Sequence, residues 1–323
     1  MLSTRTTAAA FALVSVIFFT VSSHLTKLLV DDNYVTIIMA FRTLIAAGVL
    51  WVIFLCAERT FSVLILVCWP FWWWLGMFIL AILFYGLAFA SRSIDDVLVI
   101  AAMMPLLVMF VDFQANPETV QIAVLPVVFF MFLAATAPSI YGWWSGQDQL
   151  ALSWGTAFAV GATICHAAWV ILGRAVQRKS PSETQAGARL ALMFTFAALF
   201  LLILIELKIP QWFEEVVRHR NYRPSFWHWA EFWDGWNLAG AGTFAGLSAF
   251  FIVLAIKRDN PGRVIPYHYT LAVWTLLLTL ALAPERYTAQ RLKVTAASAA
   301  IIAIGAMILF WISGRDPPDS KGD

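Results

Sequence analysis

Long apolar stretches alternate with short polar segments along the whole chain. We place apolar windows at about residues 8–30, 34–56, 69–90, 95–112, 122–141, 154–176, 187–207, 236–256, 263–283 and 294–313. A helix needs about 20 residues to cross a hydrocarbon core of roughly 30 Å. Lipid offers the backbone no hydrogen-bond partners, and these windows are too long for barrel strands. The pattern therefore predicts an all-α integral membrane protein with ten transmembrane helices.

The composition agrees with this prediction and narrows the function. Hydrophobic residues make up 61% of the chain and charged residues 12%, which is far outside the range of a water-soluble globular protein. The sequence contains no phosphate-binding glycine loop, HExxH motif, cysteine cluster or nucleophile elbow. We therefore expect no enzymatic activity, no cofactor and no bound metal. No basic tail or stripe is present, so we also expect no nucleic-acid partner.

The sequence also suggests an internal repeat. A shift of 167 positions lays Trp69 on Trp236 and Pro117-Glu118 on Pro284-Glu285 without a gap. The earlier helices match at a shift of 147, which lays Arg42 on Arg189. We therefore expect a first five-helix repeat at 1–145 and a second at 150–315. An odd number of helices in each unit inverts one repeat relative to the other, a plan that recurs in secondary transporters.

The difference between the two shifts implies an insertion of about 20 residues at 209–235. This segment mixes tryptophan and phenylalanine with arginine and acidic residues, a composition suited to the lipid headgroup layer. It is interpreted either as a helix that lies on the membrane or as a lid over a substrate entrance. The polar tail at 314–323 is expected to be disordered.

Several features resemble one transporter family. The segment from Tyr269 through Trp274 and Pro284-Glu285 to Gly305 places an aromatic residue, a short helix, a glutamate at a turn and a small-residue last helix in order. Pro105 precedes Glu118 by thirteen residues in the first half. The chain thus resembles the ten-helix EamA-like proteins of the drug/metabolite transporter superfamily. It departs from their pattern where Phe19 and His166 replace tryptophans of helices 1 and 6, where Ala272 replaces a helix 9 proline, and where proline replaces the glycine before each glutamate.

The resemblance implies a central cavity surrounded by helices 1, 3, 4, 6, 8 and 9. Helices 4 and 9, with Pro105 and Pro266, are also the short or proline-interrupted pair that marks binding sites in such repeats. The substrate-binding residues that we predict are Ser23, His24, Tyr85, Met104, His166, Trp169, Tyr267 and Tyr269. Further polar or aromatic candidates on these helices are Ser22, Met103, His268 and Trp274.

Several of these residues have a structural alternative. His24 lies within a turn or two of Asp31, so it either faces the cavity or reaches the interface. Serines such as Ser22 and Ser23 often bond to the carbonyl groups of their own helix. Trp72, Trp73 and Trp74 are interpreted as members of the aromatic belt at the membrane interface. The glycine pair at 242 and 246 is interpreted as a close helix-packing site.

Coupling to an ion gradient has one candidate. An embedded histidine can carry a proton in the physiological range, and no acidic residue lies clearly at a helix centre. Either His166 carries a proton, or the substrate gradient alone drives transport.

We predict a secondary transporter that moves a small organic metabolite, such as an amino acid or a related amphipathic compound, across the cytoplasmic membrane. By analogy with the family, the direction is outward. The alternatives are a flippase for a lipid-linked precursor and a membrane sensor or assembly factor. Outside the insertion, Lys and Arg are more numerous on segments that lie in the cytoplasm when the N-terminus does, so we expect both termini inside.

Overall fold

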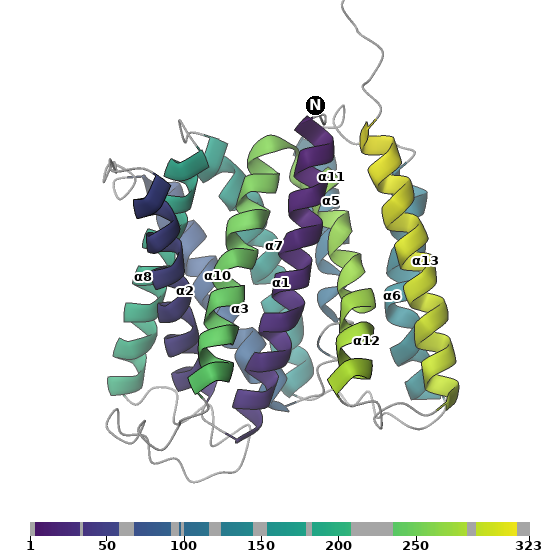
Figure 1. Cartoon of the computed structure of the whole chain (residues 1–323), viewed down its shortest axis with the longest axis horizontal. Coiled ribbons are helices and arrows are strands. Elements are labelled where there is room, and N and C mark those ends of the chain that lie inside the picture. Colours follow the sequence, from purple (N-terminus) through teal and green to yellow (C-terminus); the bar gives the residue numbers. More distant parts are fainter. Residues whose placement is uncertain are drawn as a thin grey trace, which may run out of the picture.

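The computed structural model shows a bundle of helices (Figure 1). It describes residues 4–32, 35–57, 68–91, 97, 100–115, 124–144, 154–178, 183–207, 235–282 and 289–314. Every regular element in these ranges is helical. The elements are α1 (Thr4–Asp32), α2 (Val35–Ala57), α3 (Trp69–Ser91), α5 (Met104–Ala115), α6 (Val124–Trp144), α7 (Trp154–Arg178), α8 (Glu183–Glu206), α10 (Gly235–Arg258), α11 (Pro261–Val264), the 3-10 helix η4 (Ile265–Thr270), α12 (Leu271–Leu282) and α13 (Ala289–Gly314).

The described helices have the lengths and surfaces of a multi-pass membrane protein. Eight helical segments are long and apolar enough to cross a membrane, and two shorter apolar helices cover 104–114 and 124–138. Large apolar side chains cover the outside of the bundle, and Leu55, Phe110 and Met307 are each more than 60% exposed. Water-soluble proteins rarely expose such a large apolar surface, whereas a lipid environment accommodates it. The prediction of an all-α integral membrane protein is confirmed at this level.

Four helix packings organise the bundle. α1 packs along α10, α3 along α7, α2 along α8 and α6 along α13, and α10 also contacts α2. The α6 and α13 pair stands at one edge of the bundle (Figure 1). Each of the four pairs joins a helix from the first half of the chain to a helix from the second half. Residues of both halves therefore form the core between the helices.

Glycines allow α10 to approach α2 closely. A Cβ atom on Gly242 would lie 2.6 Å from Cβ of Ile45 and 2.8 Å from the carbonyl oxygen of Arg42. A Cβ atom on Gly246 would lie 3.0 Å from the carbonyl oxygen of Ala46. Only a residue without a side chain permits this approach. The interpretation of the pair as a packing site is confirmed.

Both of the proline-containing segments are interrupted. The window predicted at 95–112 contains a turn at Ala102 and Met103, and α5 begins only at Met104, immediately before Pro105. The window predicted at 263–283 begins with α11 and then becomes a 3-10 helix that contains Pro266 before α12 continues. Proline lacks the N–H group that would continue the helical hydrogen bonds. These two windows are therefore not the single continuous helices that hydropathy predicted.

The tryptophan run at 72–74 divides between two environments. Trp72 and Trp73 are 42% and 49% exposed, as residues of the interfacial belt would be. Trp74 is fully buried, and its ring stacks on Trp169 with 6.1 Å between the ring centroids. The belt interpretation is therefore wrong for Trp74, because the helical rotation of 100° per residue turns this position towards α7.

Some predictions fall outside the described residues. These are the insertion up to residue 234, the two Pro-Glu pairs and the polar tail beyond Gly314.

Candidate functional site

A cavity lies inside the bundle, between helices from both parts of the chain. The empty space within it, including the part that is open to the outside, is about 800 Å³. The cavity is lined by residues of α1, α2, α3, α7, α8, α10 and η4. The lining residues are Ser15, Phe19, Ser23, Met39, Arg42, Thr43, Phe78, Ala81, Ile82, Tyr85, Phe89, His166, Trp169, Phe194, Ala245, Ser248, Ala249, Ile252 and His268.

His166 stands at the centre of an aromatic wall of this cavity. Its ring lies 5.8 Å from Tyr85, 6.0 Å from Phe19 and 5.6 Å from Trp169, measured between centroids. The Tyr85 hydroxyl lies 3.4 Å from Nδ1 of His166, a long hydrogen bond whose direction depends on the imidazole tautomer. The ring of His268 on η4 lies 6.3 Å away. These rings offer a ligand flat apolar faces and polar ring edges together.

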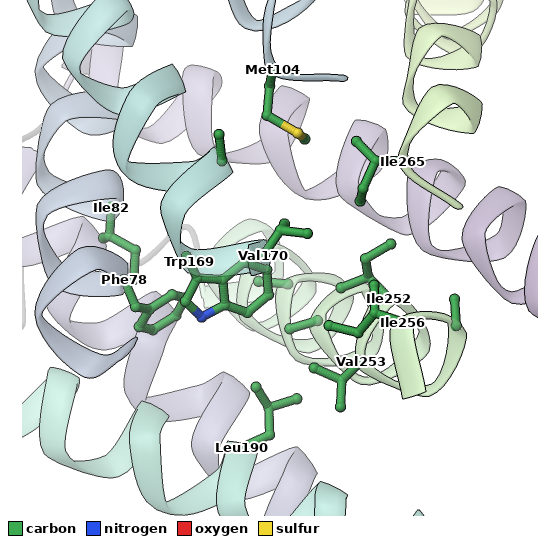
Figure 2. Close-up of a cluster of buried hydrophobic side chains, with 14 of the residues drawn as sticks. Phe78, Ile82, Met104, Trp169, Val170, Leu190, Ile252, Val253, Ile256 and Ile265 are labelled. Carbon is green, nitrogen blue, oxygen red and sulfur yellow. The ribbon is translucent and has the colours of Figure 1, made fainter. Parts of the chain in front are cut away.

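Trp169 joins this wall to the core of the bundle. Figure 2 shows its indole between Phe78 of α3 and the residues Ile252 and Ile256 of α10. The Phe78 ring lies 5.8 Å from the indole and 4.4 Å from the ring of Phe194 on α8. The indole N–H donates to Sδ of Met193 at 3.4 Å. Packing on several sides fixes the orientation of Trp169, so one wall of the cavity is rigid.

Arg42 on α2 brings a guanidinium group to the cavity. Its Nε and Nη2 atoms donate to Oγ of Ser22 at 3.2 and 2.9 Å. Ser22 in turn donates to the carbonyl oxygen of Ala241 on α10 at 2.8 Å. The serine therefore does not bond back to its own helix, as serines in helices often do. It links three helices and holds the guanidinium in place.

Three further polar side chains contribute to the cavity lining. Ser15 of α1 donates to the carbonyl oxygen of Ser248 on α10 at 2.8 Å, and the two hydroxyl oxygens lie 3.2 Å apart. His268 is 8% exposed, and its Nδ1 atom has no hydrogen-bond partner among the described residues. A buried polar atom without a partner is costly, and a ligand in the cavity would supply one.

The structure brings together only part of the predicted site. Ser23, Tyr85, His166 and Trp169 line the cavity. Met104, Tyr267 and Tyr269 are buried but are not among the lining residues. Met104 belongs to α5, which contributes none of the described residues that line this cavity, whereas the predicted ninth helix contributes His268. Consecutive residues point in different directions on a helix, and η4 presents His268 to the cavity instead of the tyrosines on either side of it.

His24 forms contacts between α1 and α12. Its Nε2 atom lies 3.2 Å from the hydroxyl of Thr279 on α12, and Nδ1 lies 3.1 Å from the carbonyl oxygen of Thr20. It is not among the residues that line the cavity. It ties α1 to α12.

Arg42 is the main residue that the predicted site omitted. Its charge within an apolar window was the available signal, because ionisable residues inside membrane helices usually face a cavity or a partner. The prediction concentrated on helices 1, 3, 4, 6, 8 and 9, which left out α2. Phe78 and Phe194 carried no comparable signal, since phenylalanine occurs throughout the apolar windows.

A second buried polar cluster lies away from the cavity lining. Arg174 of α7 pairs with Asp112 of α5 at 2.7 Å between Nη1 and Oδ1, and it also contacts the side chain of Asn260. The second oxygen of Asp112 accepts the backbone N–H of Gly262 at 3.1 Å. A Cβ atom on Gly262 would lie 2.7 Å from that oxygen. The cluster therefore holds α5, α7 and α11 together.

This cluster and the His24–Thr279 bond lie at opposite ends of α1. Arg258, at the end of α10 and two residues before Asn260, stacks its guanidinium over the ring of Phe11 near the start of α1, 4.6 Å from the centroid. His24 lies near the other end of the same helix. At that second end Lys27 also donates to the carbonyl oxygen of Phe89 at 2.7 Å. The two ends of the bundle are thus closed by different polar contacts.

Comparison with known proteins shows the fold. No protein-family profile matches the chain, and no protein of curated function matches it. A solved structure described only as the crystal structure of a protein is similar, with a TM-score of 0.68 and 14% sequence identity. The similarity covers 95% of this chain and 97% of that one. An experimentally determined protein therefore has the same fold over nearly all of its length.

Proposed function

We propose that this protein is a secondary transporter of a small organic metabolite, built as an EamA-like member of the drug/metabolite transporter superfamily. The observation that carries the proposal is the cavity, whose lining residues come from both parts of the chain. A site between two structural halves is the arrangement on which alternating access depends. The aromatic and polar lining suits an amphipathic substrate such as an amino acid or a related compound.

The packing pattern supports ten spans arranged as two inverted repeats. With α1, α2, α3, α5 and α6 as one repeat, the corresponding elements are α7, α8, α10, α12 with η4, and α13. The packing of α1 on α10 then corresponds to that of α7 on α3, while α2 with α8 and α6 with α13 are pairs of equivalent helices. A two-fold relation carries each of these packings onto itself or onto another of them.

The polar contacts at the two ends support the same relation. The shift of 167 positions lays Asp112 on Thr279. Asp112 joins the fourth helix of the first repeat to the first helix of the second, through Arg174. Thr279 joins the fourth helix of the second repeat to the first helix of the first, through His24. Related positions therefore close opposite ends of the bundle, as the two gates of an alternating-access transporter would.

The direction of transport in this proposal comes from the family resemblance. With the N-terminus in the cytoplasm, the end of the bundle that holds the start of α1 is the cytoplasmic end of a protein in the cytoplasmic membrane. Export is the direction that the resemblance to the family implies.

Ligand-dependent stabilisation of the purified protein in nonionic detergent tests the proposal. The panel contains amino acids, amines, organic acids, nucleosides and sugar phosphates. A ligand at a hundred times its dissociation constant adds about 2.7 kcal/mol to the free energy of unfolding. We expect one chemical class to stabilise the wild type and to lose this effect in His166→Ala and Trp169→Ala. Leu55→Ala, on the lipid-facing surface, serves as the control that keeps it.

Transport of the stabilising compound is then measured as counterflow in proteoliposomes. Accumulation of labelled substrate against unlabelled substrate, lost in His166→Ala and kept in Leu55→Ala, supports a carrier. Binding without counterflow favours a sensor. Movement of a fluorescent lipid between leaflets, without a response to any soluble compound, favours a flippase. Either of the last two results contradicts the proposed function.

A further inference from the structure

The charge of Arg42 is not neutralised within the part of the chain that the structure describes. A guanidinium has five N–H donors. Three contacts are present: two to Oγ of Ser22 and a weak one to Sδ of Met39 at 3.9 Å. Both acceptor atoms are neutral, and no acidic side chain of the described residues pairs with this group. Arg42 therefore retains both its charge and donors for a further partner.

The same protein treats another buried arginine differently. Arg174 has a carboxylate partner, Asp112, at 2.7 Å. A buried charge without such a partner is costly, and in membrane helices it is found where it faces a cavity or a pathway. Arg42 lines the cavity, so an anion that enters there would neutralise it.

The geometry around Arg42 favours recognition of an oxyanion. Ser22 donates its proton to the carbonyl oxygen of Ala241, which leaves the oxygen of its hydroxyl to accept from the guanidinium. One edge of the guanidinium is thereby fixed, and Nη1 is left with only the distant thioether. A planar guanidinium held in one orientation suits a carboxylate or a similar group better than a flexible ammonium would.

The remaining lining residues favour a ligand with an apolar body and disfavour a positively charged one. Phe19, Phe78, Tyr85 and Trp169 present rings to the cavity, and Nδ1 of His268 offers one further polar contact. No Asp or Glu is among the lining residues in the described ranges. An ammonium group would therefore find no carboxylate there and would be repelled by Arg42.

We propose that the cavity selects small organic anions, in which an oxyanion binds Arg42 and an apolar or aromatic body lies against the rings of Phe19, Tyr85 and Trp169. This inference rests on the proposed function and deepens it, because it favours an organic acid over a zwitterionic amino acid or a cationic amine.

A series of probes with one body and different charges tests the charge preference. The probes are 3-phenylpropanoate, phenylalanine and phenethylamine, and their dissociation constants are measured by calorimetry on the full-length protein in nonionic detergent. We expect 3-phenylpropanoate to bind most tightly and phenethylamine least. Arg42→Gln should weaken binding of the anion by about ten- to hundred-fold, the value of a hydrogen bond to a charged group.

Arg189→Gln is the matched control. Arg189 lies on α8 at the position that corresponds to Arg42, donates to the carbonyl oxygen of Val176 at 2.5 Å and is not a lining residue. It should leave the affinity for 3-phenylpropanoate unchanged. If Arg42→Gln does not give a monodisperse protein, Arg42→Lys replaces it. The lysine variant should bind the anion more weakly and still prefer it over phenethylamine.

The outcomes separate this inference from the proposed function. Equal or tighter binding of phenylalanine or phenethylamine, lost in His166→Ala, overturns the anion preference and leaves the transporter site standing. An unchanged affinity in Arg42→Gln also overturns it. A response to dihexanoyl phosphatidate without a response to 3-phenylpropanoate assigns the anion site to a lipid headgroup and overturns the small-molecule ligand. Absence of binding by every probe overturns the inference, and if the metabolite panel is also silent the proposed function fails with it.

Discussion

Arg174 and Asp112 lie 62 residues apart in the sequence and form a buried ion pair in which Nη1 and Oδ1 are separated by 2.7 Å. The pair connects α7 to α5, and Asp112 extends the connection to the backbone of α11 through Gly262. It lies at one end of the bundle, and neither residue is among those that line the cavity. Under the proposed function, the pair would hold this end closed and would not bind the substrate.

We expect Asp112→Asn to destabilise the protein by about 3 kcal/mol, because it leaves the buried guanidinium of Arg174 without its counter-charge. The measurement is the apparent free energy of unfolding in mixed micelles. Arg174→Gln and the double variant complete a mutant cycle, and the double variant should lose less than the sum of the two single losses. Glu206→Gln is the control, since Glu206 is an exposed carboxylate at the end of α8 and is not part of this cluster. Strict additivity of the two single effects would show that the ion pair does not act as a unit.

We expect Gly242→Ala to lower the thermal unfolding midpoint and to weaken ligand binding together. The added methyl group would lie 2.8 Å from the carbonyl oxygen of Arg42, so α10 must move away from α2. That movement separates Ser22, which bonds to Ala241, from the guanidinium that it holds. Gly48→Ala is the matched control, because a Cβ atom there meets nothing within 4 Å. If Gly242→Ala and Gly48→Ala had the same midpoint, the close contact would not be energetically significant.

We expect Tyr269→Phe to keep both ligand affinity and counterflow, and to leave stability equal or slightly higher. The Tyr269 hydroxyl is buried and has no hydrogen-bond partner among the described residues, so its removal relieves an unsatisfied group. The residue does not line the cavity, in contrast to the role that the sequence suggested for it. Calorimetry with the stabilising ligand measures the affinity. A loss of more than tenfold would return Tyr269 to the binding site.

We expect His166→Gln to abolish acceleration of transport by a pH gradient while counterflow at equal pH remains measurable. Of the described residues that line the cavity, only His166 and His268 have side chains that ordinarily change charge between pH 5 and 8. His166 contacts Tyr85, Phe19 and Trp169, so a change in its charge reaches the whole aromatic wall. Leu55→Ala, on the exposed surface, is the control and should retain the acceleration. Persistence of the gradient effect in His166→Gln, or its absence in the wild type, contradicts a coupling role.

The apolar windows of the sequence determined the class of the protein and the position of its helices. Eight helical segments long enough to span a membrane, and two shorter ones, lie at the ten predicted places, because a lipid environment requires long apolar stretches and requires them to be helical. The glycine pair at 242 and 246 was also recognisable, since small residues four positions apart mark one face of a helix. Such features depend on a single helix and its solvent.

Only the tertiary structure decided which side chains share the cavity. Tyr269 and His268 are neighbours in η4, but only His268 lines the cavity. Trp74 was expected in the interfacial belt but stacks on Trp169 inside the bundle. The role inferred for Arg42 depends on its hydrogen bonds to Ser22 and on the lack of an acidic neighbour among the described residues. Neither feature is visible along the chain. Hydropathy fixes that a residue lies within the membrane. It does not fix the rotation of one helix against another, and that rotation determines which residues form a site.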